Sequence, residues 1–339
     1  MKEFKGYQKG INLGGWLSQC NYTIERYETF ITEEDFKRFS QWDIDHVRIP
    51  VDYPLLEEED GTPTPHGMMY LQRAVDWCEK YNLNMVLDLH KAPGYFFNDR
   101  EEQKFFYDND LKERFYALWM RLATAFGKYS DRIAFELLNE VTEPKYSKPW
   151  NEIANECIKR IRTVAPNAYI LVGSYWNNAI DSMHDLDMPY DDKIVYNFHC
   201  YDPFLFTHQG ASWAWGMPND FRLNFSATKQ DYLKAQNELK LFDGFMPYAP
   251  NDVIDHTFFE WRFERAAKLA EERGVMLYCG EYGVINHADP HETLEWYKAI
   301  NTAFKKYGIG RACWSYKHMS FGLIDDHMKD VVDEVVKYL

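Results

Sequence analysis

Eight short apolar runs, each followed by a helical pattern, constrain most strongly how this chain can fold. Continuously apolar runs are typical of parallel strands buried on both faces, whereas strands with one wet face alternate. Eight strand–helix alternations in 339 residues favour a closed (β/α)8 TIM barrel over an open doubly wound sheet. The predicted strands are Gly10–Leu13, His46–Pro50, Met85–Leu89, Ile133–Leu138, Tyr169–Gly173, Lys193–Phe198, Val275–Gly280 and Arg311–Trp314.

Several segments between these strands carry helix signals of their own. Thr32 followed by Asp35 is a capping box, which predicts a helix over Glu33–Trp42. Asp289 followed by Pro290 is an N-cap with proline at the first helical position. A Rossmann fold would need a G-x-G-x-x-G motif after the first strand, and the sequence does not supply one there.

The longest stretch between predicted strands lies after the sixth strand and comprises residues 203–254, with a predicted helix near Lys229–Leu241. Long insertions in barrels occur in loops, and the βα loops build the active-site face. We therefore expect one barrel domain, residues 1–339, in which this insertion forms a lid or cleft wall. The last residues, Asp330–Leu339, look amphipathic and are expected to form the final helix of the barrel.

Composition narrows the classes of partner. The formal net charge is −15 and basic residues never cluster beyond a pair, which argues against nucleic acid and anionic membranes. No apolar run approaches the roughly 18 residues needed to span a bilayer. Residues 1–10 lack the apolar segment of a secretory signal, but a signal can be removed, so the compartment stays open. A monomer is expected.

Neither a metal nor a cofactor is predicted. The six cysteines are widely spread without a C-x-x-C motif, and we expect free thiols, not disulfides or metal ligands. His287 and His291 are four residues apart, but Pro290 prevents the uninterrupted helix that would place both imidazoles on one face. The aromatic content of 17% would suit stacking on sugar rings, although most aromatic side chains must belong to the core.

Polar or aromatic side chains follow most of the predicted strands. Glu140 comes just after the fourth strand and Glu281 just after the seventh. In a TIM barrel these positions meet at one face, and a pair of carboxylates is what glycoside hydrolysis usually requires. Arg48 lies inside the second strand, where a buried guanidinium demands an acidic partner such as Glu281. Further strand-end candidates are His90, His199, Tyr201 and Trp314.

The segments Leu137–Glu140 (Leu-Leu-Asn-Glu) and Gly280–Gly283 (Gly-Glu-Tyr-Gly) resemble the signatures of glycoside hydrolase family 5, the cellulase family of clan A. The resemblance runs nearly end to end, and within the family it is greatest to the clostridial endoglucanase C group. Other segments that carry it, in order, are Gly10–Trp16, His46–Pro50, Leu87–Gly94, Tyr196–Tyr201 and Cys313–Tyr316.

This resemblance implies a retaining endo-β-1,4-glucanase that acts on a β-linked polysaccharide or oligosaccharide. Glu140 would be the acid/base and Glu281 the nucleophile. Asn139 would bond to the sugar 2-hydroxyl. Arg48 and Tyr201 would hydrogen-bond to Glu281 and keep it ionised. His90, His199 and Trp314 would line the sugar subsite next to the catalytic residues. We expect the two carboxyl groups to lie about 5–5.5 Å apart, as retention requires, and nearby negative charge to raise the pKa of Glu140.

Lys91 departs from the family pattern, because many cellulases of the family carry a second histidine at this position. Lys91 is expected to contact a sugar hydroxyl or a carboxylate, or else to be solvated. The departure leaves open a β-mannanase, a xyloglucanase or a β-1,3-glucanase, and also the choice between endo and exo action. A non-catalytic sugar-binding barrel is disfavoured, since a degenerate member should have lost a carboxylate and both remain.

Overall fold

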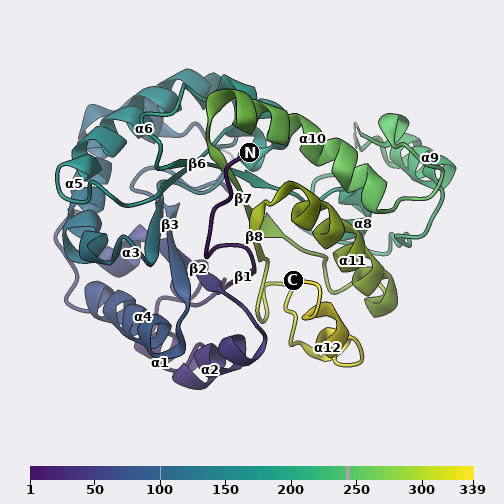
Figure 1. Cartoon of the computed structure of the whole chain (residues 1–339), viewed down its shortest axis with the longest axis horizontal. Helices are drawn as coiled ribbons and strands as arrows, with labels where there is room; N and C mark the ends of the chain where they lie inside the picture. Colours follow the sequence, from purple (N-terminus) through teal and green to yellow (C-terminus); the bar gives the residue numbers. More distant parts are fainter. Residues whose placement is uncertain (100, 242–244) are drawn as a thin grey trace.

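The computed structural model describes residues 1–99, 101–241 and 245–339. Its centre is a closed barrel in which each strand pairs in parallel with the next and β1 closes on β8 (Figure 1). The predicted TIM barrel is therefore confirmed. The strands are β1 (Gly10–Asn12), β2 (His46–Asp52), β3 (Asn84–Lys91), β4 (Ile133–Glu136), β5 (Ile170–Gly173), β6 (Ile194–His199), β7 (Met276–Tyr282) and β8 (Gly310–Cys313).

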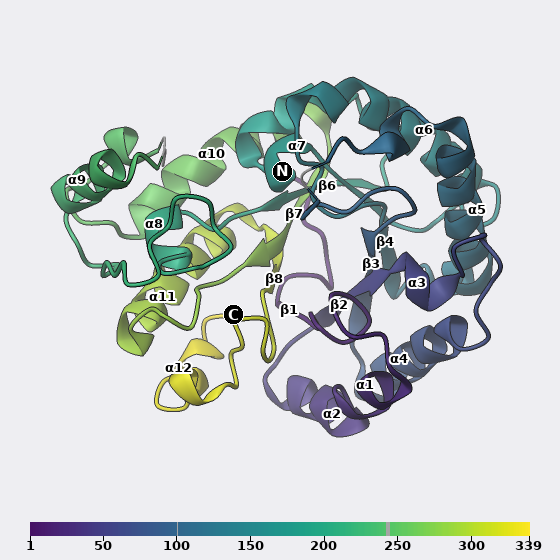
Figure 2. The ribbon, with the colours of Figure 1, turned by 180° about the vertical axis from the view of Figure 1, so that it is seen from behind.

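Helices surround the barrel on its outer side, as Figures 1 and 2 show from opposite directions. The long ones are α2 (Glu33–Gln41), α4 (Gly67–Tyr81), α5 (Asn109–Phe126), α6 (Ser147–Arg162), α10 (His256–Arg273) and α11 (Pro290–Tyr307). The others are α1 (Ile24–Thr29), α3 (Tyr53–Leu56), α7 (Tyr175–Asn178), α8 (Phe204–Thr207), α9 (Lys229–Leu239) and α12 (Val332–Val335). In the described part of the chain, no helix combines the length and apolarity that crossing a membrane would take.

Both predicted helix starts are confirmed. The Asp35 carboxylate accepts from the backbone N–H of Thr32 at 2.8 Å, which closes the capping box of α2. Asp289 accepts from the backbone N–H groups of His291 and Glu292 at 2.8 and 3.2 Å at the start of α11.

The expected final helix over Asp330–Leu339 is wrong in extent, because α12 contains only Val332–Val335. After this turn the chain continues to the buried residue Leu339, whose carbonyl accepts from the guanidinium of Arg311 in β8. Burial of the chain end against the barrel thus replaces the continued helix. All six cysteines are free, as predicted.

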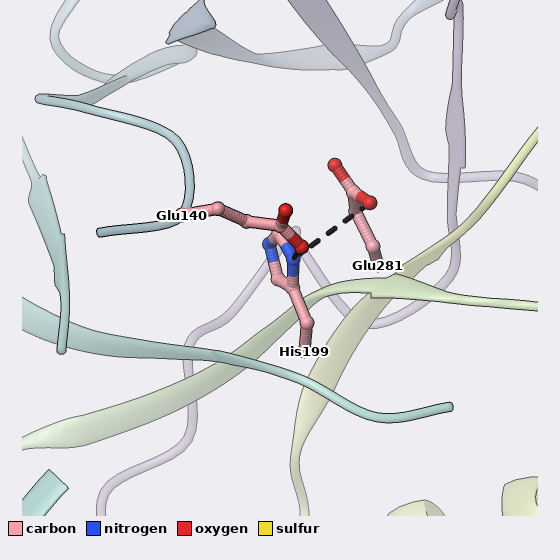
Figure 3. Close-up of side chains that lie close together, drawn as sticks. All are labelled: Glu140, His199 and Glu281. Atoms are coloured by element: carbon pink, nitrogen blue, oxygen red, sulfur yellow. Dashed lines mark hydrogen bonds and ion pairs between the residues drawn. The ribbon is translucent and has the colours of Figure 1, made fainter. Parts of the chain in front are cut away.

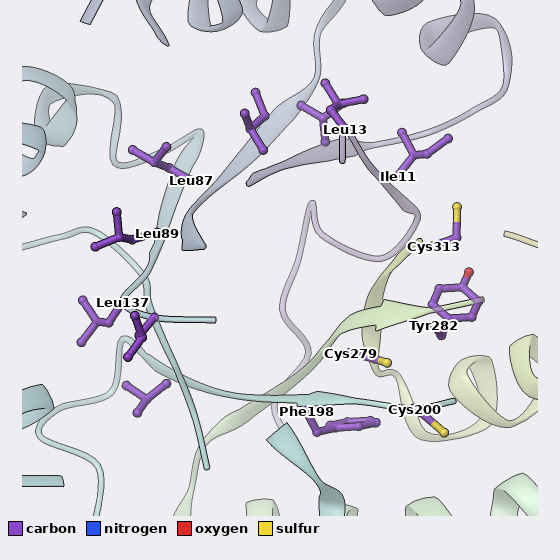
Figure 4. Close-up of a cluster of buried hydrophobic side chains, with 14 of the residues drawn as sticks. Ile11, Leu13, Leu87, Leu89, Leu137, Phe198, Cys200, Cys279, Tyr282 and Cys313 are labelled. Atoms are coloured by element: carbon purple, nitrogen blue, oxygen red, sulfur yellow. The ribbon is translucent and has the colours of Figure 1, made fainter. Parts of the chain in front are cut away.

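Alternation along the strands decides which side chains reach the site. In β3, Leu87 and Leu89 pack outward against the helices, within the apolar layer of Figure 4. Asp88 and His90, which alternate with these leucines, therefore point into the barrel. The lower end of the barrel interior is filled by a separate apolar cluster of Phe4, Tyr7, Val86, Ala134, Leu171, Val195, Met276, Tyr278 and Ala312. Most of the inward polar side chains thus lie near the carboxyl ends of the strands, while His46 at the amino end of β2 contacts the Tyr278 hydroxyl at 2.7 Å.

A β-bulge in β7 sets the direction of Glu281. Phe198 pairs with Cys279, but the next residue, His199, pairs with Glu281, so Gly280 is the extra residue. Strict alternation from the outward Cys279 would turn Glu281 outward as well, and the bulge corrects this. A Cβ at Gly280 would lie only 2.9 Å from the His199 ring, so glycine is required there.

Candidate active site

A cavity of about 690 Å³ opens at the carboxyl ends of the strands. Five of the predicted residues line it: His90, Glu140, Tyr201, Glu281 and Trp314. The loop after β3 and the insertion after β6 supply further walls. The remaining lining residues are Gln19, Phe97, Asn98, Asp99, His208, Ser212, Trp213, Met319, Ser320 and Phe321.

Arg48 lies beneath this cavity, fully buried, and binds three carboxylates at once. It donates to Glu281 Oε1 at 2.8 Å and to the two oxygens of Glu136 at 2.7 and 2.8 Å, and it pairs with Asp88 Oδ2 at 3.0 Å. Amide oxygens of Asn12 and Asn139 each accept a further bond at 2.9 Å. The predicted acidic partner of Arg48 is present, and two buried acids accompany it.

The carboxylates of Glu140 and Glu281 face each other with His199 between them (Figure 3). His199 Nδ1 lies 2.8 Å from Glu140 Oε1 and 3.7 Å from Glu281 Oε2. One oxygen of each glutamate and one His199 nitrogen all lie within 4.8 Å of one another. The group is compact enough to hold a cation, but its oxygens already accept hydrogen bonds from His199, Asn177, Tyr201 and the Arg48 guanidinium. Proton transfer is therefore the simpler chemistry for it.

Burial controls the charge states in this group. It raises the pKa of Glu140, and a hydrogen bond from Asn177 opposes the rise. The sequence prediction named the wrong main cause, nearby negative charge, since removal of the carboxyl from water has the largest effect. Burial also lowers the pKa of His199 to about 4, so its imidazole is neutral near pH 7.

Tyr201 and Trp314 complete the predicted surroundings of Glu281. The Tyr201 hydroxyl donates to Glu281 Oε2 at 2.9 Å, so each oxygen of this carboxylate receives a bond. The Trp314 ring lies parallel to the His90 ring, with centroids 5.7 Å apart. A Cβ at Gly14 would lie 2.7 Å from the Trp314 ring, which explains a glycine in the loop after β1.

Several buried polar atoms near the cavity have no protein partner in the described part of the chain, and two of them belong to predicted site residues. His90 Nδ1 bonds to Asp88 Oδ2 at 2.7 Å, while His90 Nε2 is unpaired. Asn139 Oδ1 accepts from Arg48, while Asn139 Nδ2 has no partner. Since buried polar groups are normally hydrogen-bonded, these atoms are available to a bound ligand.

Lys91 is not among the residues that line the cavity. Its ammonium group is 5.1 Å from the ring centre of Phe96 and 5.9 Å from that of Tyr53, within the range of cation–π contact. A contact between Lys91 and a sugar stays a prediction.

Sequence reasoning missed the segment after β5. Asn177 Nδ2 donates to Glu140 Oε2 at 3.0 Å, and Asn178 Nδ2 lies 3.4 Å from His199 Nε2. A signal for both was present, because two amides follow the end of a predicted strand in the same way as the identified residues do. The buried acids Asp88 and Glu136 were also missed, since they lie inside runs that were interpreted as apolar.

A closed barrel with paired carboxylates at its mouth is the arrangement of a glycoside hydrolase. The chain belongs to that class through the cellulase family (glycosyl hydrolase family 5), whose sequence model matches residues 5–320.

Individual relatives agree with this membership. Cellodextrinase A of Ruminococcus flavefaciens is 42% identical over 314 residues, which cover 92% of this chain and 86% of that protein. Endoglucanase C of Acetivibrio thermocellus is 37% identical over 338 residues, with 98% of both chains covered.

Solved structures agree on the fold. The structure of the cellulose synthase subunit Z (CcsZ) of Clostridioides difficile is 25% identical, with a TM-score of 0.77 over 97% of this chain and 99% of that one. Endoglucanase Cel5A of Thermotoga maritima is 22% identical, with a TM-score of 0.76 over 97% of each chain.

Proposed function

We propose that this protein is a retaining endo-β-1,4-glucanase in which Glu140 is the acid/base and Glu281 the nucleophile. The observation that carries the proposal is the closeness of the two carboxylates, which have oxygens within 4.8 Å of each other. Retaining enzymes hold their carboxyl groups about 5–5.5 Å apart, whereas inverting enzymes keep roughly 6.5–9.5 Å to admit a water. The short separation favours direct attack by a carboxylate on the sugar.

The surroundings of the two glutamates favour a different charge state for each. Glu281 receives hydrogen bonds from Arg48 and Tyr201, which favour the anion that a nucleophile must be. Glu140 has neutral neighbours at hydrogen-bond distance and a pKa raised by burial, which suits an acid that must hold a proton. In the second step Glu140 would accept a proton from the water that releases the sugar from Glu281.

The unpaired atoms indicate how the sugar would bind. Asn139 Nδ2 is a donor and His90 Nε2, whose ring partner is the Asp88 carboxylate, is an acceptor. Sugar hydroxyls can both donate and accept, so one ring lying over Trp314 could satisfy both atoms. The relatives named endoglucanase and cellodextrinase support a β-linked glucan as substrate.

Chain length of the substrate separates two candidates. The proposed endoglucanase should hydrolyse barley β-glucan and carboxymethylcellulose with a rapid fall in viscosity. A cellodextrinase, which the 42% identity to cellodextrinase A favours, should act mainly on short cello-oligosaccharides. β-Mannan, xyloglucan and β-1,3-glucan belong in the same panel. If the enzyme hydrolyses none of the substrates in the panel, the proposal is refuted.

The pH dependence should report Glu140. The pKa of this carboxyl is raised, and its protonated form is the active acid, so kcat/KM should fall as pH rises through that pKa. His199 stays neutral above about pH 4, so its titration should cause no change in kcat/KM between roughly pH 5 and 8. The fall in kcat/KM at high pH should disappear for 2,4-dinitrophenyl β-cellobioside, whose leaving group needs no proton. An unchanged fall with that substrate would contradict the assignment.

The insertion, residues 203–254, is proposed to act as a wall of the cleft within a single catalytic domain. Trp213 lines the cavity while its side chain remains half exposed, and Trp215, two residues on, is not among the lining residues. Trp213→Ala should raise KM for long cello-oligosaccharides by roughly 10-fold through lost stacking. Trp215→Ala is the matched control and should change KM little. Equal effects of both substitutions would contradict a specific wall at Trp213.

A further inference from the structure

The segment after β5 has an unusual backbone that holds it against the loop of Glu140. Trp176, Asn177 and Asn178 have φ values of 52°, 56° and 58°, in the left-handed region. Asparagine enters this region more readily than most residues, whereas tryptophan does so at a cost of about 1–3 kcal/mol. The backbone N–H groups of Trp176 and Asn177 donate to the carbonyls of Thr142 and Val141 at 3.1 and 2.9 Å. The turn is therefore fixed beside Glu140.

Both asparagine amides of this turn reach the proton-transfer group. Asn177 Nδ2 bonds to one oxygen of Glu140, and His199 Nδ1 bonds to the other. Asn178 Nδ2 then contacts the far nitrogen of the same histidine ring, Nε2, at 3.4 Å. Asn178 is fully buried, and the His199 side chain is 2% exposed. A continuous chain of contacts thus runs from Asn178 through His199 to Glu140.

The chemistry of this chain determines where the imidazole carries its proton. In the orientation that the Asn178 amide adopts, its nitrogen faces His199 Nε2. An amide nitrogen only donates, so in this orientation Nε2 accepts and carries no hydrogen. A neutral imidazole has one N–H, which then lies on Nδ1 and donates to Glu140 Oε1. The other ionisable groups around His199 are Glu281, Glu136, Arg48 and His90, and its low pKa of about 4 shows that burial outweighs the acids among them.

We propose that Asn178 is a positioning residue that holds His199 in its Nδ1–H tautomer and thereby turns the acidic proton of Glu140 toward the cleft. With Nδ1–H and Asn177 both donating, each oxygen of Glu140 has one lone pair occupied. The acidic proton of Glu140 must then lie on a remaining lone pair. From there it passes to the glycosidic oxygen as the glycosidic C–O bond breaks. In the Nε2–H tautomer, Nδ1 would accept this proton's hydrogen bond and draw it away from the leaving oxygen.

This inference rests on the acid/base role proposed for Glu140, and its first test needs no substitution. In protein labelled with 15N-histidine, the His199 signals are assigned by their absence from His199→Gln. We expect Nδ1 to carry the hydrogen and Nε2 to appear unprotonated at pH 7. A hydrogen on Nε2 would overturn the proposal, whatever the activity of the enzyme.

The second test uses Asn178→Asp, which keeps the shape but replaces the donor by an acceptor and should reverse the tautomer. For cellotetraose, whose leaving group needs a proton, kcat/KM should fall about 10²-fold, within the usual range for general acid catalysis. For 2,4-dinitrophenyl β-cellobioside the loss should be roughly 3-fold or less, since no acid is needed. Asn178→Leu removes the donor without supplying a charged acceptor, and its kcat/KM should fall between wild type and Asn178→Asp. Thermal unfolding of Asn178→Leu reports separately the cost of leucine at the positive φ of this position.

Equal losses with both substrates would mean a merely structural role and would overturn the proposal. Asn167→Asp, at an exposed position, is the matched control for the change of charge and should behave as wild type. Failure of the wild-type enzyme to hydrolyse either substrate would instead refute the proposed function. The two kinds of failure are therefore distinguishable.

Discussion

Glu281→Gln is expected to lower kcat for β-glucan hydrolysis by roughly 10⁴-fold or more, as removal of a catalytic nucleophile does in other enzymes. The glutamine keeps the size of the side chain, and its carbonyl oxygen can still accept from Arg48 while its NH2 group donates to the Tyr201 oxygen, but it cannot form the glycosyl-enzyme bond. The fold should survive, because a buried carboxylate is replaced by a neutral group. Initial rates on barley β-glucan and thermal unfolding measure the two effects separately.

Glu143→Gln is the matched control for this substitution. Glu143 is exposed, lies three residues after Glu140 and, within the described residues, forms an ion pair with Lys145 alone, so its replacement should leave kcat unchanged. The roles of the two glutamates can also be separated by adding azide to alanine variants. Azide should yield an α-glycosyl azide with Glu281→Ala, where it replaces the nucleophile, and a β-glycosyl azide with Glu140→Ala, where it replaces the water. The opposite stereochemistry would exchange the two roles.

Arg48→Met should destabilise the protein by about 3–5 kcal/mol, because it leaves buried carboxylates without their cation. Burial already raises the pKa of Asp88 to about 7 and raises that of Glu136, while Arg48 opposes both shifts. Without the guanidinium these acids should titrate still higher. A carboxyl whose folded pKa lies above its unfolded value loses stability as pH rises, so the variant should be weaker at pH 8 than at pH 5.

Urea unfolding at both pH values measures this effect. Arg73→Met is the control, since Arg73 forms a bidentate pair with Glu28 on the surface, where such pairs contribute about 0–1 kcal/mol. A loss of stability for Arg48→Met that matches this control, or that grows toward low pH, would contradict the account of the buried network.

Sequence alone was enough to predict the barrel, because its strands are buried on both faces and so appear as apolar runs. The position of Glu140 and Glu281 after β4 and β7 followed from that, since the carboxyl ends of parallel strands meet at one mouth. Arg48 was found by the requirement that a buried guanidinium has acidic partners.

Other features depended on details that a pattern of residue types does not contain. The direction of Glu281 relies on the bulge at Gly280, and a glycine within a strand does not reveal which way the next side chain turns. The left-handed turn at Asn177 and Asn178 depends on backbone bonds to the loop after Glu140. The raised pKa of Glu140 follows from burial, which local sequence does not specify.

The central claim is that Glu281 attacks the sugar while Glu140 supplies the proton. A 2-deoxy-2-fluoro cellobioside with an activated leaving group should form a slowly hydrolysed glycosyl-enzyme, because the fluorine destabilises the oxocarbenium-like transition states of both steps while the activated leaving group speeds only the first. Mass spectrometry of the digested protein should then find the sugar esterified to Glu281. A label on any other residue, or turnover of β-glucan without any trapped sugar, would contradict the account.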